Sequence, residues 1–230
     1  MNGFIETISA SFQANANEEN AIAMSAYMKN NFEFFGIKTP ERRTLCKQHL
    51  TEHALHSLGE VEAITKLLWQ LPQREFQYYG IELMHYYRKW WKPSSLTLFK
   101  YCITNKSWWD SIDAIASDWI GEFMQMYPAK IPVTREWNQS SNMWLQRTSL
   151  LFQKRYKQKT DLALLSENIL HLSSSKEFFI QKAIGWALRE YAKVDEDWVK
   201  EFVHLHANIL AALSKKEALK NVDNYKTSEE

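Results

Sequence analysis

The chain has 230 residues, of which 45% are hydrophobic and 24% are charged, and its net charge at pH 7 is +1. This length allows one large domain or an array of repeats around a sizeable core, and the near-neutral charge does not by itself indicate a nucleic-acid-binding protein. The sequence opens without a basic segment followed by an apolar stretch, and no apolar run reaches the roughly 20 residues that span a membrane. We therefore expect neither a signal peptide nor a membrane helix. Only Cys46 and Cys102 are present, without a CxxC pair, which favours a reducing cytoplasm.

The sequence is poor in helix breakers, with six Gly and five Pro, which predicts helices joined by short loops. Residues 15–20 (NANEEN) are expected to form a loop and a helix start. Gly36 is expected to break the chain before the next helix, which Thr39 caps and Pro40 opens. Three further helix starts are predicted from residues that can cap helices: Ser107 and the capping boxes at 174–177 and 214–217.

A stripe of possible metal ligands follows Thr39. Cys46, His49, His53 and His56 lie along one predicted helical face, and two of the histidines have i, i+4 spacing. A single helix cannot close a tetrahedral site, and the sequence has no HExxH motif or paired CxxC. We therefore expect no metal ion and, because nucleotide-binding and GxSxG motifs are absent, no cofactor.

Residues 106–113 (KSWWDSID) place two tryptophans next to two aspartates. Trp109 and Asp113 are four residues apart and share one helix face. Trp108 and Ile112 share a second face, rotated by about 100°, that suits the core. One interpretation is a surface that presents an indole beside a carboxylate. The other is an exposed aspartate next to a half-buried aromatic residue.

Features of helix starts recur about every 35 residues. Aromatic residues return at this spacing at Trp109, Trp144 and Phe179. Polar residues return at matching phase in six successive predicted helices: Arg42, Gln77, Ser111, Gln146, Gln181 and Lys216. A period of this length is typical of helical-hairpin repeats. We expect a solenoid in which one helix of each pair lines a concave surface and turns the polar phase toward the concavity.

Side chains from consecutive repeats are expected to converge on one groove: Asp113, Arg147, Lys182 and Trp186. Alternatively, Arg147 belongs to a solvated helix face and Trp186 packs in the core. The helix that carries Lys182 and Trp186 is strongly amphipathic, because residues 180–188 place apolar side chains at i, i+3, i+4 and i+7. These apolar residues are Ile180, Ala183, Ile184 and Ala187.

Basic residues concentrate between residues 140 and 193, where nine Lys and Arg residues stand against four Asp and Glu residues. Cations interleaved with aromatic residues are typical of a surface that follows a nucleic-acid backbone, although such a cluster can also be a solvated face. We expect a single domain over residues 1–230, with a frayed tail from about residue 222 onward.

Six stretches resemble the AlkD-type alkylpurine DNA glycosylases, which are built of HEAT-like helical repeats. They are YMKN (27–30), FFGIKTPERR (34–43), KSWWDSID (106–113), WLQR (144–147), YKQK (156–159) and SSSKEFFIQKAIGWALREYAK (173–193). They span nearly the whole chain in the family's order. The resemblance implies an all-α solenoid of about six helix pairs with a concave basic groove. It also implies hydrolysis of the N-glycosidic bond of cationic N3- or N7-alkylated purines in duplex DNA, without base flipping.

The resemblance further implies roles for individual residues. Asp113 matches the catalytic aspartate, and Trp109 and Trp186 match aromatic residues that contact the backbone of the lesion nucleotide. Arg147 matches an arginine that contacts phosphate at the active site. The expected DNA contacts are Tyr27, Lys38, Thr39, Arg43, Arg155, Lys157 and Lys182. Lys38 departs from the family motif, which has glutamine there. The implied protein is a cofactor-free monomer that is cytoplasmic and associated with the nucleoid.

A single carboxylate fits this chemistry independently of the resemblance. Ordinary glycoside hydrolysis needs a second carboxyl group to protonate the leaving group. An alkylated purine already carries positive charge and leaves as a neutral base, so one carboxylate can stabilise the cationic sugar and orient water. The alternative function is a non-catalytic helical-repeat protein that binds DNA structures or a protein partner. Retention of Trp109, Asp113, Arg147 and Trp186 favours the enzyme.

Overall fold

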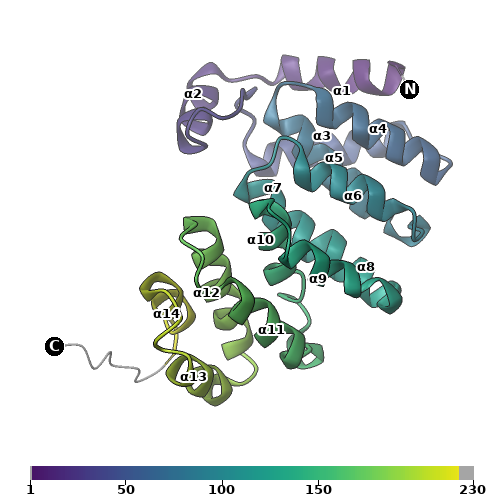
Figure 1. Ribbon diagram of the computed structural model, residues 1–230. Helices are drawn as coiled ribbons and strands as arrows, with labels where there is room; N and C mark the ends of the chain where they lie inside the picture. Colours follow the sequence, from purple (N-terminus) through teal and green to yellow (C-terminus); the bar gives the residue numbers. More distant parts are fainter. Residues whose placement is uncertain (1, 223–230) are drawn as a thin grey trace. The chain divides into compact units, whose positions relative to one another are not determined.

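The computed structural model describes residues 2–222, and helices dominate this part of the chain (Figure 1). Among residues 2–222, a single β-bridge joins Glu33 to Gln73. The all-α fold predicted from the sequence is therefore confirmed. Each helix in the described residues is too short or too polar to cross a lipid bilayer. The predicted tail lies outside the described residues, apart from its first residue, Val222.

Contacts within the chain divide it into two compact units, Met1–Cys102 and Ile103–Glu230, and the single domain expected from the sequence stays a prediction. Aromatic packing builds the core of the first unit, where the ring of Phe12 lies 5.5 Å from Phe76 and 6.4 Å from Tyr79 between centroids. The helices of this unit are α1 (Asn2–Ala14), α2 (Glu18–Tyr27), α3 (Thr39–Glu52), α4 (Leu58–Gln70), α5 (Arg74–Tyr86), the 3-10 turn η1 (Arg88–Trp90) and α6 (Ser95–Thr104), whose last residues pass into the second unit.

Gly36 breaks the chain before α3, as predicted. Its φ of +84° is in the left-handed region, and a Cβ atom there would lie 2.0 Å from the carbonyl oxygen of Asn17, so only glycine fits. The buried carboxylate of Glu75 accepts the backbone N–H groups of Phe35, Gly36 and Ile37. These bonds fix the path by which the chain enters α3.

Helix starts are only partly those predicted. Asn17 caps α2 through its side chain, which confirms the start expected in residues 15–20. Thr39 is the first residue of α3 and its N-cap is Lys38, one residue earlier than expected. The starts predicted from serines are wrong, because the N-caps of α7, α12 and α14 are Trp108, Glu177 and Ala211. A side-chain cap is worth only about 1 kcal/mol, so tertiary packing easily overrides it.

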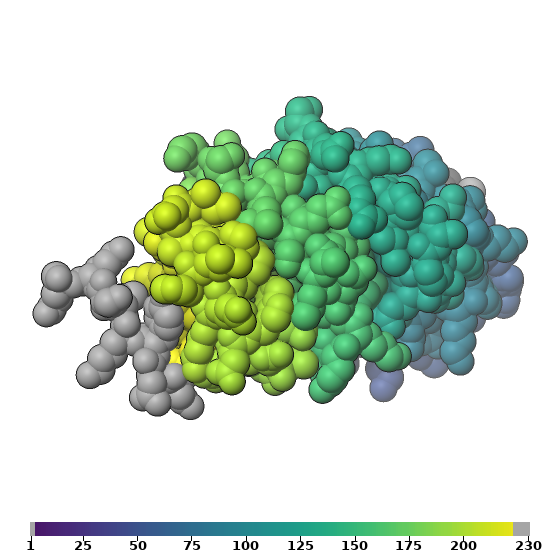
Figure 2. Space-filling view, turned by 60° about the horizontal axis from the view of Figure 1, so that its bottom comes forward, coloured from purple at the N-terminus to yellow at the C-terminus, as the bar shows by residue number. Residues whose placement is uncertain are grey.

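The second unit contains a row of helices, α7, α10, α12 and α14, in which each helix packs against the next, while α9, α11 and α13 pack on the members of this row (Figure 1). In Figure 2 the surface of this unit passes from green to yellow in chain order. The apolar stripe predicted in residues 180–188 is buried in its core. The elements of this unit are α7 (Trp109–Ala114), η2 (Ile115–Ile120), α8 (Gly121–Met126), η3 (Pro128–Lys130), α9 (Pro132–Asn138), α10 (Met143–Leu151), η4 (Lys157–Lys159), α11 (Leu162–Leu172), α12 (Phe178–Ala192), α13 (Glu196–Leu205) and α14 (Ala212–Ala218).

Most of the recurring polar residues turn inward, which corrects the prediction, whereas Lys216 is exposed as expected. Gln77 and Ser111 are fully buried, and Arg42 is nearly so. Three glutamine amides of this phase each donate to a carbonyl oxygen six residues earlier: Gln77 to Leu71 at 2.9 Å, Gln146 to Ser140 at 2.7 Å and Gln181 to Ser175 at 3.0 Å. Each amide thus hydrogen-bonds a backbone carbonyl group in the segment that connects its own helix to the preceding one. The phase recurs because helix ends leave carbonyl groups that need donors.

Candidate functional site

Asp113 lies on a helix that changes its winding two residues later, at Ile115. Trp109 and Asp113 both belong to α7, one turn apart, as predicted. The chain then continues directly into the π-helix η2 and from there into α8. A π turn shifts the register of the side chains around it and is frequent at functional sites. The hydroxyl of Ser117 in η2 donates to the carbonyl oxygen of Asp113 at 2.5 Å, which ties the two segments together.

An aromatic cluster that includes Trp108 lies beside this helix. The ring of Trp108 lies 5.8 Å from Trp144 and 5.2 Å from Phe179 between centroids, and the last two are 5.2 Å apart. Trp108 is the extended N-cap of α7, with φ of −158°, so it does not share a helical face with Ile112. Ile112 alone of that predicted pair is fully buried.

The carboxylate of Asp113 is held by both arms of the Arg147 guanidinium. Nε donates to Oδ1 at 2.7 Å and Nη2 donates to Oδ2 at 2.8 Å, a bidentate pairing with strong charge-assisted bonds. Nη1 donates to the carbonyl oxygen of Phe179. The side chain of Arg147 is 1% exposed, whereas that of Asp113 is 16% exposed. The structure thus brings together the two residues that α7 and α10 contribute to the predicted site.

The pairing leaves Asp113 with unused capacity as an acceptor. Each carboxylate oxygen has two lone-pair sites, and the Arg147 fork occupies one on each. Arg147 itself directs one N–H from each of its three nitrogens into the protein, so two of its five N–H groups remain. The phosphate contact expected of this buried side chain stays a prediction.

Cations surround the indole of Trp186 in α12. Four positively charged groups lie within 6 Å of its ring centroid: Arg147 at 5.2 Å, Lys182 at 5.6 Å, Lys154 at 5.7 Å and Arg189 at 5.9 Å. Attraction between a cation and the face of an indole is among the stronger contacts of this kind. Trp186 is half-buried. It therefore packs against the core, as the alternative interpretation expected, but is not enclosed by it.

Glu217 of α14, predicted from the sequence only as part of a capping box, completes the site. Its carboxylate accepts from Lys182 Nζ at 2.7 Å, Trp186 Nε1 at 3.0 Å and Arg189 Nη1 at 2.9 Å. The hydrogen bond from Lys182 is the main cause that lowers the pKa of Glu217, and the Trp186 bond and the charges of Lys182 and Arg189 lower it further.

The repeat could have revealed Glu217. Glu217 follows Lys182 by 35 residues, much as Arg147 follows Asp113 by 34. The recurring polar residues identified in the sequence, Gln181 and Lys216, each lie one position before this pair.

Two hollows border this cluster within the second unit. One, of about 430 Å³, is lined by residues that include Trp186, Lys154, Arg189 and Lys220. The other, of about 350 Å³, also contains Lys154 and adds Lys157. Together they place several cations of the predicted basic segment around the same cluster.

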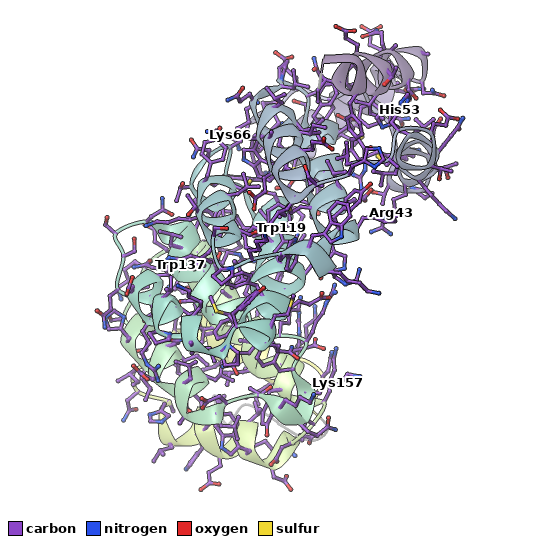
Figure 3. All side chains as sticks on the ribbon, turned by 90° about the vertical axis from the view of Figure 1, so that its right-hand side faces the viewer. Arg43, His53, Lys66, Trp119, Trp137 and Lys157 are labelled. Carbon is purple, nitrogen blue, oxygen red and sulfur yellow. The ribbon has the colours of Figure 1, made fainter. Side chains whose placement is uncertain are left out.

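Two of the residues predicted to contact DNA are exposed on the second unit. Lys157 has a φ of +52°, a left-handed conformation that costs a residue with a side chain roughly 1 kcal/mol, and Figure 3 shows its side chain at the edge of the unit. Arg155 is 65% exposed and forms an ion pair with Asp118 of η2.

Four of the predicted DNA contacts belong to the first unit. Tyr27, the last residue of α2, is 68% exposed. Lys38 and Thr39 are exposed at the start of α3, where no side chain caps the helix, and such helix starts favour anions. Arg43, one turn later and labelled in Figure 3, is 69% exposed, with its Nε 3.3 Å from a Glu82 carboxylate oxygen.

The predicted stripe of four metal-ligand types is wrong, because α3 ends at Glu52 and His56 is exposed beyond it. Cys46 and His49 are buried in α3. The ring nitrogens of His49 lie 2.8 Å from the hydroxyls of Thr7 and Tyr79. Burial and the neighbouring His53 lower the pKa of His49 to about 4. Burial raises the pKa of the Cys46 thiol. In residues 2–222, no three histidine, cysteine or acidic side chains are grouped so that they could hold a metal ion.

Known proteins share this arrangement of helices. The sequence model of a family described as "DNA alkylation repair enzyme" matches residues 8–222. A solved structure described as a predicted DNA alkylation repair enzyme from Enterococcus faecalis is 34% identical, with a TM-score of 0.84, and the match covers 91% of this chain and 97% of that one. AlkD2 from Streptococcus mutans is 20% identical, with a TM-score of 0.60 over 77% of this chain and 88% of its own, and shows the fold alone. No curated protein matches the sequence.

Proposed function

The chain belongs to the family of DNA alkylation repair enzymes, and on this premise we propose that it is a DNA glycosylase. Membership implies a DNA substrate. The proposed reaction is hydrolysis of the N-glycosidic bond of cationic N3- and N7-alkylated purines in duplex DNA. One observation carries the proposal: the partly exposed carboxylate of Asp113 is fixed by a buried arginine within a site rich in cations and indoles.

Asp113 is proposed to act on the sugar and on the attacking water. The electron pair of the N-glycosidic bond passes to the alkylated purine, which leaves as a neutral base. The oxygen of water bonds to C1′, and Asp113 accepts the proton that the water loses. Its negative charge also stabilises the positive charge that develops on the sugar as the bond breaks.

The residues around Asp113 hold it in place for this step. The Arg147 fork fixes the plane of the carboxylate and leaves one lone-pair site on each oxygen for water. Trp109 and Trp186 are proposed to contact the backbone of the lesion nucleotide. Because the purine leaves without a general acid, the base can stay stacked, and we include the absence of base flipping in the proposal.

The rest of the proposed DNA interface consists of polar and basic residues of both units, all exposed except the half-buried Lys182. Cations bind DNA by neutralising phosphates, and helix starts bind phosphates through their N–H groups. The proposed contacts are Tyr27, Lys38, Thr39 and Arg43 of the first unit, and Arg155, Lys157 and Lys182 of the second. We propose that the protein acts as a monomer associated with the nucleoid.

The test is release of 7-methylguanine from methylated duplex DNA under single-turnover conditions, with wild type and Asp113→Asn. The amide keeps the size of the carboxylate but loses its charge, so we expect the rate to fall on the order of a hundredfold. The matched control is Asp197→Asn, because that side chain is 98% exposed on α13. The substitution at Asp113 also unpairs the buried Arg147, so rates are compared well below the melting temperature of each variant.

A non-catalytic binder remains the second candidate, because a buried ion pair such as Asp113–Arg147 can serve the fold alone. Wild-type protein that binds DNA but releases no base would favour this candidate. Undiminished release by a folded Asp113→Asn protein would remove Asp113 from the mechanism.

A further inference from the structure

Gly185 lets α12 and α14 approach unusually closely. A Cβ atom at Gly185 would lie 2.4 Å from the Cβ of Glu217 and 2.8 Å from the carbonyl oxygen of Ser214. The hydroxyl of Ser214 donates to the carbonyl oxygen of Gln181 at 2.9 Å, which joins the same two helices. This contact brings the Glu217 carboxylate to Trp186, the residue that follows Gly185.

The two carboxylate oxygens of Glu217 accept hydrogen bonds from three donors. Oε1 accepts from Lys182, whereas Oε2 accepts from both Trp186 Nε1 and Arg189. The side chain is only 11% exposed, so these bonds are shielded from water. One carboxylate therefore restrains two cations and the polar edge of one indole.

The indole connects Glu217 to the Asp113–Arg147 pair. The guanidinium of Arg147 lies 5.2 Å from the Trp186 ring centroid while it holds Asp113. Rotation of the indole would remove one wall of the space that Arg147 occupies. It would also remove the cation–π contacts of Lys182 and Arg189, which lie within 6 Å of the same ring.

We propose that Glu217 is a positioning residue for base excision: it fixes the indole of Trp186 beside Arg147 and restrains Lys182 and Arg189. This inference rests on the proposed glycosylase function. Loss of its charge has two opposite effects. The released cations become free to bind phosphates, so DNA affinity rises, while the loosened Trp186 lowers the excision rate. Simple damage to the fold would lower both.

The experiment compares wild type, Glu217→Gln and the control Glu201→Gln, which removes the same charge from an exposed position on α13. For Glu217→Gln we expect several-fold tighter binding to undamaged duplex and a salt dependence steeper by about one unit of log–log slope. The single-turnover release of 7-methylguanine at saturating protein should fall on the order of tenfold or more. Glu201→Gln should show the wild-type rate.

A third readout follows Trp186 directly. The Nε1–H resonance of Trp186, assigned by its loss in Trp186→Phe, should move in Glu217→Gln and stay in place in Glu201→Gln. An unchanged excision rate in Glu217→Gln, or a parallel loss of rate, affinity and melting temperature, overturns the positioning role. If the wild type releases no base, the proposed function fails separately, and the resonance and the DNA affinity decide whether Glu217 controls Trp186 and its cations.

Discussion

Arg147 carries a buried positive charge in the second unit, and this charge needs a partner. Removing a guanidinium from water costs several kcal/mol, and the fork with Asp113 offsets this cost only while both partners are present. The pair therefore adds little net stability, yet its separation is expensive. Such an arrangement suits a site in which a carboxylate must keep one orientation.

Arg147→Ala should impair DNA binding and base excision, because it removes a positive charge and frees the Asp113 carboxylate to rotate. We expect the free energy of unfolding to fall by roughly 3–5 kcal/mol, as for other broken buried pairs. Arg135→Ala is the control, because its pair with Glu167 is exposed and should contribute less than about 1 kcal/mol. Chemical denaturation and a DNA-binding assay measure both effects. Equal losses in the two variants would show that Arg147 has no special role.

His49 should make the stability of the first unit depend on pH. Burial and the neighbouring His53 lower its pKa from the ordinary 6.5 to about 4 in the folded chain, so the unfolded chain binds more protons between these values. The contribution of neutral His49 to the free energy of unfolding is fully present above pH 6.5. It declines as the pH falls toward 4, by at most about 3 kcal/mol. His49→Gln should be less stable at pH 7 and show a flatter decline in urea denaturation from pH 7 to 4. A decline as steep as in the wild type would assign the effect to other groups.

Several connecting elements carry strained backbone. In residues 2–222, four residues other than glycine have φ between +49° and +58°: Lys29, Asn30, Lys106 and Lys157. All four lie in the stretches that resemble the glycosylase family: YMKN, KSWWDSID and YKQK. Strain of this kind persists only where surrounding structure enforces it, and it clusters at functional sites. The stretches that resemble the family therefore specify the conformation of turns as well as of helices.

Gly185→Ala should separate α12 from α14, because the added methyl group would meet Glu217 and the Ser214 carbonyl. We expect destabilisation of about 1–3 kcal/mol from this overpacking. The control is Gly59→Ala in α4, where a Cβ meets nothing within 4 Å and the better helix propensity of alanine adds up to about 1 kcal/mol. Thermal melts of both variants measure the contrast. A stabilised Gly185→Ala protein would mean that α14 shifts at no cost.

At the scale of the whole molecule, affinity for duplex DNA should fall steeply with salt. The net charge is only +1, but nine cations concentrate in residues 140–193, and cations that contact phosphates release counterions on binding. A plot of log Kd against log salt measures the number of phosphates contacted. Lys154→Gln should reduce its slope by about one unit. Binding that ignores salt between low and physiological concentration would contradict a DNA-tracking surface.

Sequence periodicity alone determined that this chain is helical and repetitive. The buried stripe of α12 and the break at Gly36 were predictable because they depend on local geometry and on nearest neighbours in the chain. The 35-residue period was also correct, and it relates Asp113 to Arg147 and Lys182 to Glu217. Local patterns of this kind survive folding because every repeat must bury the same face.

Only the tertiary structure decided which polar residues face inward and what they bond. Gln77, Gln146 and Gln181 were expected at a surface, yet they satisfy carbonyl groups of the connections before their helices. Glu217 belongs to the site because Gly185 allows α14 to approach α12, and no pattern within either helix encodes that approach. The direction of a polar side chain depends on unpaired groups contributed by other elements, and these exist only after the helices have packed.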